Sequence, residues 1–138
     1  MEITIQSAAG DFHYNPVPHS DRLNIVGSAA LSGDHAEGIT PMALLLHAYA
    51  GCMSIDVEMI LAKQKQRVDQ LQIRVEAERN DGVPKYFTKL VTHVNVVGKV
   101  NLAKLEKAVQ LSADKYCSVK HSLREDIEFE FVCNVSAV

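Results

Sequence analysis

The chain of 138 residues is predicted to fold as an α+β protein, with mainly antiparallel sheets around one long, buried central helix. An uninterrupted run of helix-forming residues, 40–66, lies between segments in which apolar and polar residues alternate as in half-buried strands. These strand-like segments come in runs, which favours antiparallel pairing over a parallel sheet with regularly interleaved helices. The length fits a single domain, with a strand meander over 1–38 and a helix, hairpin, second helix and final strand over 39–138.

The N-terminal segment is predicted to be a small meander of short strands. Ile3 and Ile5 alternate with polar residues, as in a strand with one buried face. Pro16 and Pro18 end the next strand because proline has no backbone donor. The expected elements are a strand over 1–6, a turn at 8–11, a second strand over 12–15, a third over 23–29 and a loop over 31–38.

The long helix is predicted over 40–66. Thr40 is a good N-cap, and Pro41 suits the first helical position, where a backbone donor is not needed. No charged residue occurs over 38–55 when His47 is neutral, so this half of the helix should be enclosed on all sides. About 18 uncharged residues approach the length that crosses a bilayer. The polar residues within the run and the acids directly after it favour a buried core helix over a membrane span.

The length of this helix predicts an oligomer. About 27 residues at 1.5 Å each make a helix about 40 Å long, which exceeds the diameter of a globule of this size. A second copy that packs its own helix alongside would bury the remaining apolar face, and two-fold symmetry is the commonest arrangement. The sequence therefore predicts an intertwined homodimer in which residues 40–60 are almost fully buried.

The C-terminal part is predicted to contain a hairpin, a helix and a last strand. Apolar and polar residues alternate over 68–79, and the Asn-Asp-Gly turn at 80–82 predicts that a strand over 86–97 pairs back. Asn101 is a good N-cap for a helix that runs to about Lys115. A last strand is expected on the same sheet, and its inward-facing residues are Ile127, Phe129, Phe131, Cys133 and Val135.

Composition excludes several classes of function. The formal net charge is −3, and Lys and Arg are dispersed among acids, so the basic footprint of a nucleic-acid-binding protein is missing. The polar N-terminus lacks the basic and apolar regions of a secretory leader, which predicts a cytoplasmic protein. The histidines show no metal-ligand spacing and there is no C-x-x-C, so neither a metal nor a cofactor is expected. Three widely spaced cysteines indicate buried thiols or redox chemistry rather than a disulfide framework.

Cys52 and Cys117 are the candidates for chemistry. Two thiols that meet can reduce a peroxide, because one becomes a sulfenic acid and the other resolves it as a disulfide. The first thiol needs a lowered pKa and access to solvent. Cys117 precedes a short predicted helical turn, whose N-terminus favours a thiolate, and Lys115 and Lys120 lie close in sequence. Asp56, one helical turn after Cys52, opposes ionisation of that thiol.

Each candidate also has a structural interpretation. Both thiols would serve equally well as small core side chains, as most free cysteines do. Cys133 alternates with phenylalanines and is expected in the strand core. His47 is expected to be a hydrogen-bonded core histidine. His121, four residues after Cys117, would share a helical face with it and could act as its base.

Two stretches, TPMALLLHAYAGCMSIDVEMIL at 40–61 and ADKYCSVKHSL at 113–123, resemble the OsmC/Ohr family of osmotically induced and organic hydroperoxide resistance proteins. The resemblance extends from about residue 39 to the C-terminus. It implies an α+β homodimer with two sites at the subunit interface, in which Cys52 is the peroxidatic thiol and Cys117 the resolving thiol. It also implies an oxidative-stress function, with organic hydroperoxides as substrates and a thiol or dithiol as reductant.

The chain departs from the family pattern beside the expected site. Met42 stands where catalytic members have a Glu, the turn at 8–11 lacks their Arg, and Ser118 replaces the Pro after the second Cys. An Arg near a thiolate lowers its pKa, and Arg22 and Glu37 are candidate substitutes for the missing pair. These departures favour an alternative in which the same pocket binds a small hydrophobic or thiol-bearing ligand without turnover.

Overall fold

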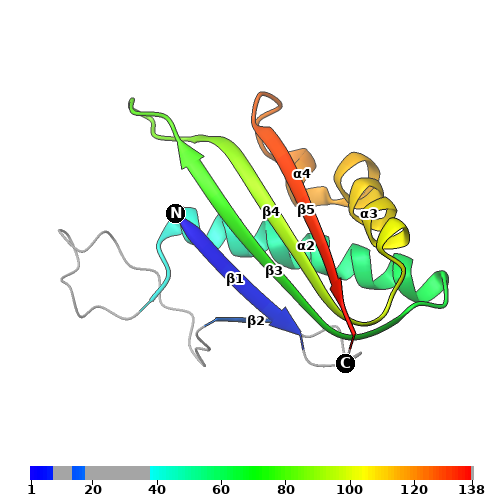
Figure 1. Cartoon of the computed structure of the whole chain (residues 1–138). Coiled ribbons are helices and arrows are strands. Elements are labelled where there is room, and N and C mark those ends of the chain that lie inside the picture. Colours follow the sequence, from blue (N-terminus) through cyan, green and yellow to red (C-terminus); the bar gives the residue numbers. More distant parts are fainter. Residues whose placement is uncertain (8–13, 18–37, 138) are drawn as a thin grey trace.

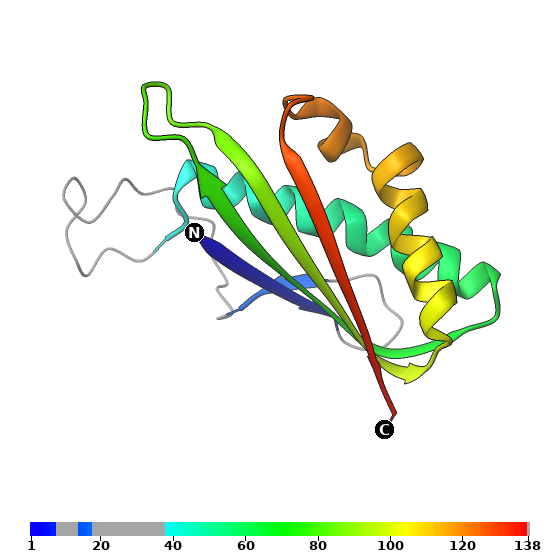
Figure 2. The ribbon, with the colours of Figure 1, turned by 45° about the horizontal axis from the view of Figure 1, so that its top comes forward.

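A computed structural model describes residues 1–7, 14–17 and 38–137, and these form one five-stranded sheet with α2, α3 and α4 on the same face (Figures 1 and 2). The turn at 8–11, the third strand at 23–29, most of the loop before the long helix, and Arg22 and Glu37 lie outside the described residues. In chain order the elements are β1 (Glu2–Ser7), β2 (Tyr14–Pro16), α2 (Pro41–Lys63), β3 (Arg67–Arg79), β4 (Phe87–Lys99), α3 (Leu102–Leu111), the π-helical turn η1 (Ser112–Tyr116), α4 (Ser118–Ser122) and β5 (Glu128–Ser136).

The strands lie in the order β2-β1-β3-β4-β5, and the α+β prediction with mainly antiparallel pairing is confirmed. The pairing between β4 and β5 is parallel, with Val94 opposite Cys133. The sequence does not reveal this direction, because an alternating strand buries the same face in either orientation. The intervening α3, η1 and α4 return the chain to the other end of β4, which is the crossover that a parallel pair requires.

Helix α2 begins and ends for identifiable reasons. The Thr40 hydroxyl accepts a hydrogen bond from the backbone three residues on (3.3 Å), as predicted for an N-cap. The helix ends at Lys63, three residues earlier than predicted. Lys65 adopts a left-handed conformation (φ 57°), and the Gln66 N–H donates to the Leu61 carbonyl at 2.9 Å, which closes the last turn.

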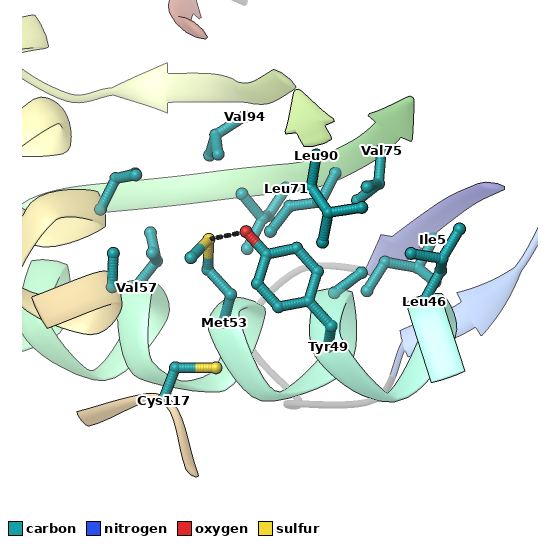
Figure 3. Packing of buried hydrophobic residues seen from close by; sticks show 14 of the residues in the cluster. Ile5, Leu46, Tyr49, Met53, Val57, Leu71, Val75, Leu90, Val94 and Cys117 are labelled. Atoms are coloured by element: carbon teal, nitrogen blue, oxygen red, sulfur yellow. Dashed lines mark hydrogen bonds between the residues drawn. The ribbon is translucent and has the colours of Figure 1, made fainter. Parts of the chain in front are cut away.

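One face of α2 packs on the sheet and forms most of the core. Figure 3 shows Tyr49 and Met53 between the helix and the strands, close to Leu71 and Val94. Tyr49 is fully buried, and its hydroxyl lies 2.8 Å from the buried Thr92 hydroxyl of β4, so each satisfies the other. The α2 side chains with at most 1% exposure are Leu46, Tyr49, Ala50, Met53, Ser54, Val57 and Leu61.

A buried carboxylate ties the N-terminal strands to the same helix. Glu58 of α2 is only 5% exposed, and it accepts hydrogen bonds from the Tyr14 hydroxyl at 2.7 Å and the Ser7 hydroxyl at 3.4 Å. Tyr14 belongs to β2 and Ser7 to β1, so two strands are held to one helix position. A buried polar side chain requires hydrogen-bond partners of this kind.

The opposite face of α2 stays open in a single chain. Ile55 and Met59 are 42% and 45% exposed, and Ala48 is also exposed, so one chain alone does not bury residues 40–60. By length and composition α2 could cross a membrane, but the core helix of a globular protein meets the same criterion. One face of α2 is buried against the sheet, as in such a core helix. The predicted homodimer stays a prediction.

The hydroxyl pair between Tyr49 and Thr92 can be tested by a double-mutant cycle. Tyr49→Phe and Thr92→Val should each destabilise the fold by about 1–3 kcal/mol, because each removes the short hydrogen bond between the two buried hydroxyls. In Thr92→Val the Tyr49 hydroxyl keeps only its longer hydrogen bond to the Met53 sulfur, at 3.9 Å (Figure 3). The double variant should lose clearly less than the sum of the two, measured by urea unfolding. Thr88→Val, which removes a hydroxyl near the exposed end of β4, is the matched control and should change stability by less than about 0.5 kcal/mol. Strictly additive losses would contradict the pairing.

Candidate functional site

The fold brings Cys52 and Cys117 together, as the dithiol hypothesis requires. Their sulfur atoms and a carboxylate oxygen of Asp56 all lie within 4.8 Å of one another. Both cysteines are free thiols. We call these three residues the Cys₂Asp cluster. Two thiols and a carboxylate form a redox-capable pair and also a donor set that zinc-class cations accept.

Two elements position the thiols differently. Cys52 lies in the middle of α2, on its open face, and is half-buried. Cys117 follows the π-helical turn η1, in which its N–H donates to the Ser112 carbonyl at 2.7 Å, and it is fully buried. Figure 3 shows the Cys117 side chain pointing toward α2. The Cys117 sulfur accepts a hydrogen bond from the Lys120 N–H at 3.4 Å, so this thiol caps the short helix α4.

The Cys117 thiol is not the thiolate that its place before a helical turn predicts. Burial is the largest influence and raises its pKa to about 12, although the Lys120 N–H acts in the opposite direction. The neighbouring Cys52 and Asp56 raise it further. The ammonium groups of Lys115 and Lys120 lie over aromatic rings, of Tyr116 and Phe129 respectively. Cys117 is therefore protonated at neutral pH.

Asp56 is held in place by a residue that sequence reasoning did not single out. The Ser112 hydroxyl donates to Asp56 Oδ2 at 2.9 Å and is fully buried. Ser112 opens the π-helical turn η1, whose C-cap is Cys117, so one turn positions both the second thiol of the cluster and the hydroxyl that binds the carboxylate. The helical spacing allows either Leu111 or Ser112 on the buried stripe of this helix, but no sequence signal marks a π-helical turn or a contact between Ser112 and Asp56.

An apolar cleft of about 330 Å³ adjoins the cluster between α2 and the α3–η1 segment. Asp56 belongs to both the cleft and the Cys₂Asp cluster, which connects the two. The volume is suitable for a small organic molecule. Its lining residues are Asp56, Met59, Ile60, Lys63, Gln64, Leu111 and Tyr116.

The other candidate residues lie apart from the thiols or contribute only packing. His47 is half-buried, burial lowers its pKa so that it is neutral, and its Nδ1 has no hydrogen-bond partner among the described residues, contrary to the expected core hydrogen bond. His121 is exposed on α4 and makes no side-chain hydrogen bond to Cys117, so a role as its base has no support. Cys133 is half-buried and packs against the core from β5, where burial raises its pKa to about 11.

The activating residues expected from the family pattern are not supplied by the described part of the chain. Met42 is half-buried and packs against the core. Each arginine among residues 38–137 has a partner away from the thiols: Arg67 pairs with Asp69, Arg74 with Glu2 and Glu76, Arg79 with the Lys85 carbonyl, and Arg124 with Asp126.

Comparisons with known proteins agree on one family. A family model described as OsmC-like protein matches residues 33–132. Protein YhfA of Escherichia coli K12 is 39% identical over 97 residues, which cover 70% of this chain and 71% of that protein. A hypothetical protein from Aquifex aeolicus VF5 has a similar structure, with a TM-score of 0.74, 24% identity, and coverage of 100% of this chain and 98% of that chain. The organic hydroperoxide resistance protein OhrB of Bacillus subtilis has a TM-score of 0.64 at 16% identity, with 94% and 96% covered. At these identities the two structures show the fold alone.

The raised pKa of Cys117 predicts its reactivity. Alkylation of the native protein, followed by mass spectrometry, should label Cys117 slowest of the three cysteines at pH 7 and faster as the pH rises toward 12. Asp56→Asn removes a charge that raises this pKa, so labelling at pH 9 should accelerate by about two- to tenfold. Asp114→Asn, at an exposed aspartate of η1, is the matched control and should have no effect. Rapid labelling of Cys117 at pH 7 would contradict the assignment.

Proposed function

This chain belongs to the OsmC-like protein family, and on that premise we propose that it is a thiol-dependent peroxidase that reduces organic hydroperoxides through Cys52 and Cys117. The observation that carries the proposal is the approach of the two thiols, from elements far apart in sequence, to within 4.8 Å. The name of the Bacillus subtilis protein of the same fold supports organic hydroperoxides as the substrate class.

Accessibility supports Cys52 as the thiol that attacks the peroxide. It is half-buried on the open face of α2, whereas Cys117 is fully buried and protonated. The Cys52 thiolate attacks the terminal oxygen of the hydroperoxide, an S–O bond forms, and the O–O bond breaks. The alkoxide takes a proton and leaves as the alcohol, and Cys52 is left as a sulfenic acid.

Cys117 then resolves the sulfenic acid. Its sulfur attacks the Cys52 sulfur, a disulfide forms, and the hydroxyl group leaves as water with the proton that Cys117 gives up. A dithiol reductant then restores both thiols and becomes a disulfide itself. The raised pKa of Cys117 suits this role, because a protonated buried thiol does not compete for the peroxide.

The apolar cleft supports an organic substrate rather than hydrogen peroxide alone. Met59, Ile60 and Leu111 offer contacts to a hydrocarbon body, and Asp56 lies where the cleft meets the thiols. Burial of apolar substrate surface provides affinity that a small polar peroxide cannot gain. In this proposal the protein acts in the cytoplasm, where thiol reductants are abundant.

The open face of α2 supports a homodimer with two sites at the subunit interface. Ala48, Cys52, Ile55 and Met59 recur at spacings of three and four residues, so they form one apolar stripe that includes the reactive thiol. A second copy would cover the exposed side chains of this stripe, which are Ala48, Ile55 and Met59. Contiguous exposed apolar surface of this kind is typical of an interface.

A second candidate function is binding without turnover. It is favoured by one observation: no arginine among the described residues lies free to lower the pKa of a peroxidatic thiol. In that case the cleft would hold a small hydrophobic or thiol-bearing ligand, and the two thiols would be contact residues.

Peroxide consumption by thiol variants separates the two functions. With dithiothreitol or dihydrolipoamide as reductant, the protein should consume cumene hydroperoxide and tert-butyl hydroperoxide. Cys52→Ser should abolish consumption, because no sulfenic acid can form there. Cys117→Ser should react once and accumulate the sulfenic acid or over-oxidised forms of Cys52, seen by mass spectrometry.

Cys133→Ser is the matched control, because that half-buried thiol lies on β5 and outside the cluster, and its rate should equal that of the wild type. No consumption of any peroxide by folded, reduced protein would leave the binding function. Turnover with Cys52 unmodified, or Cys133 in the peroxide-induced disulfide, would overturn the assigned roles.

The homodimer has its own test. Sedimentation equilibrium at micromolar concentration should give a mass of about 30 kDa, twice the chain mass of 15.2 kDa. Ile55→Glu places a charge in the apolar stripe and should shift the mass to that of one chain. Leu102→Glu is the control, since Leu102 is similarly exposed (45%) on α3 and should leave the dimer intact. A 15 kDa wild type would refute the dimer.

A further inference from the structure

The Cys₂Asp cluster has the composition of a metal site. Cys52 and Asp56 project from adjacent turns of α2, and Cys117 comes from the segment that follows η1. Within residues 1–7, 14–17 and 38–137 these residues are the one group of three histidine, cysteine or acidic side chains found with ligand atoms this close, all within 4.8 Å. Two residues at i and i+4 on a helix, with a third from another element, are a common way to surround a small cation.

We propose that the reduced cluster binds a thiophilic divalent cation of the zinc class, with the Cys52 and Cys117 sulfurs and one Asp56 oxygen as ligands. Tetrahedral zinc has bonds of about 2.3 Å to sulfur and about 2.0 Å to oxygen, so its ligand atoms lie about 3.5–3.8 Å apart. The cluster must therefore contract by no more than about 1.3 Å, which rotations of three short side chains can supply.

The surroundings of the ligands fit this role. The Ser112 hydroxyl orients the Asp56 carboxylate through Oδ2, and the other carboxylate oxygen accepts no hydrogen bond from any described residue. The Lys120 N–H donates to the Cys117 sulfur, a contact that stabilises a metal-bound thiolate. Three protein ligands leave the fourth position of a tetrahedral ion open, and Asp56 lies at the wall of the adjoining cleft.

The donor types select the class of ion. Thiolates are soft ligands that favour zinc, cadmium or cobalt over magnesium and calcium, which prefer oxygen ligands only. The carboxylate, in turn, favours a divalent ion over copper(I). Each thiol gives up its proton to solvent when it binds, and no electrons are transferred.

Binding has a regulatory consequence, which rests on the proposed dithiol function. Both sulfurs are committed to the ion while it is bound, so Cys52 cannot attack a peroxide and no disulfide can form. Conversely, oxidation to the disulfide removes two of the three ligands and releases the ion. Metal occupancy and peroxide turnover should therefore exclude each other.

Titration of the reduced, metal-free protein with Co²⁺ under argon tests the site directly. The expected result is one Co²⁺ per chain, with a thiolate-to-cobalt charge-transfer band and the visible bands of tetrahedral cobalt, and displacement by Zn²⁺. Cys52→Ser, Cys117→Ser and Asp56→Asn should each lower the affinity at least about tenfold. Cys133→Ser and Asp114→Asn are the matched controls and should bind as the wild type does.

Ser112→Ala provides a variant that retains all three ligands. It should weaken binding by about tenfold because the carboxylate is no longer oriented. Absence of the charge-transfer band in folded wild-type protein would overturn the site. Full affinity in Asp56→Asn and Ser112→Ala would also overturn it, since the cation would then bind to the thiols without the carboxylate.

Peroxide assays distinguish this inference from the proposed function. One equivalent of Zn²⁺ should inhibit wild-type turnover in proportion to occupancy, and a chelator should restore it. If metal-free protein binds Co²⁺ through both thiols but consumes no peroxide, the metal site stands and the peroxidase proposal fails. If it turns over peroxide and Zn²⁺ neither binds nor inhibits, the metal site fails alone.

Discussion

The packing of one face of α2 on the sheet is the constraint on which the rest of the structure depends. Tyr49, Met53 and Val57 are buried against the strands, and this packing, together with the Tyr49–Thr92 hydroxyl pair, determines the rotation of the helix about its axis. Because residues on a helix project at about 100° intervals, this rotation also determines where Cys52 and Asp56 point. The packing of the core therefore determines the positions of Cys52 and Asp56, although the side chains that face the sheet do not belong to the Cys₂Asp cluster.

Burial then gives two chemically identical thiols different properties. Cys52, on the open side of α2, is partly exposed to solvent. Cys117 is enclosed, and burial raises its pKa to about 12. A nearby negative charge on Asp56 acts in the same direction, and a single backbone N–H is too weak to reverse it. In the proposed dithiol reaction one thiol reacts first and the other follows, and among the described residues it is burial that distinguishes the two thiols.

Local patterns predicted most of the elements, and tertiary effects account for what they missed. The Thr40 cap and the alternation in β3 and β4 depend on neighbouring residues only, and these elements lie within a few residues of their predicted bounds. The direction of β5, the protonation of Cys117 and the contact between Ser112 and Asp56 depend on which distant segments meet. The two cysteine-containing stretches, in this order, indicated the family resemblance. The burial that raises the pKa of Cys117 depends on the folded structure and could not be predicted from them.

The π-helical turn η1 restricts how this chain can change in length. It contains one more residue than an α-helical turn would, because the Cys117 N–H reaches back five residues to Ser112. Loss of a single residue between them would rotate Cys117 by about 100° relative to α3 and carry its sulfur away from α2 while Ser112 stayed on Asp56. The exposed loop at 80–86 joins two strands and has no such restriction. Insertions and deletions among related chains should therefore accumulate at that loop and be rare between Ser112 and Cys117, where even one residue would separate the two halves of the site.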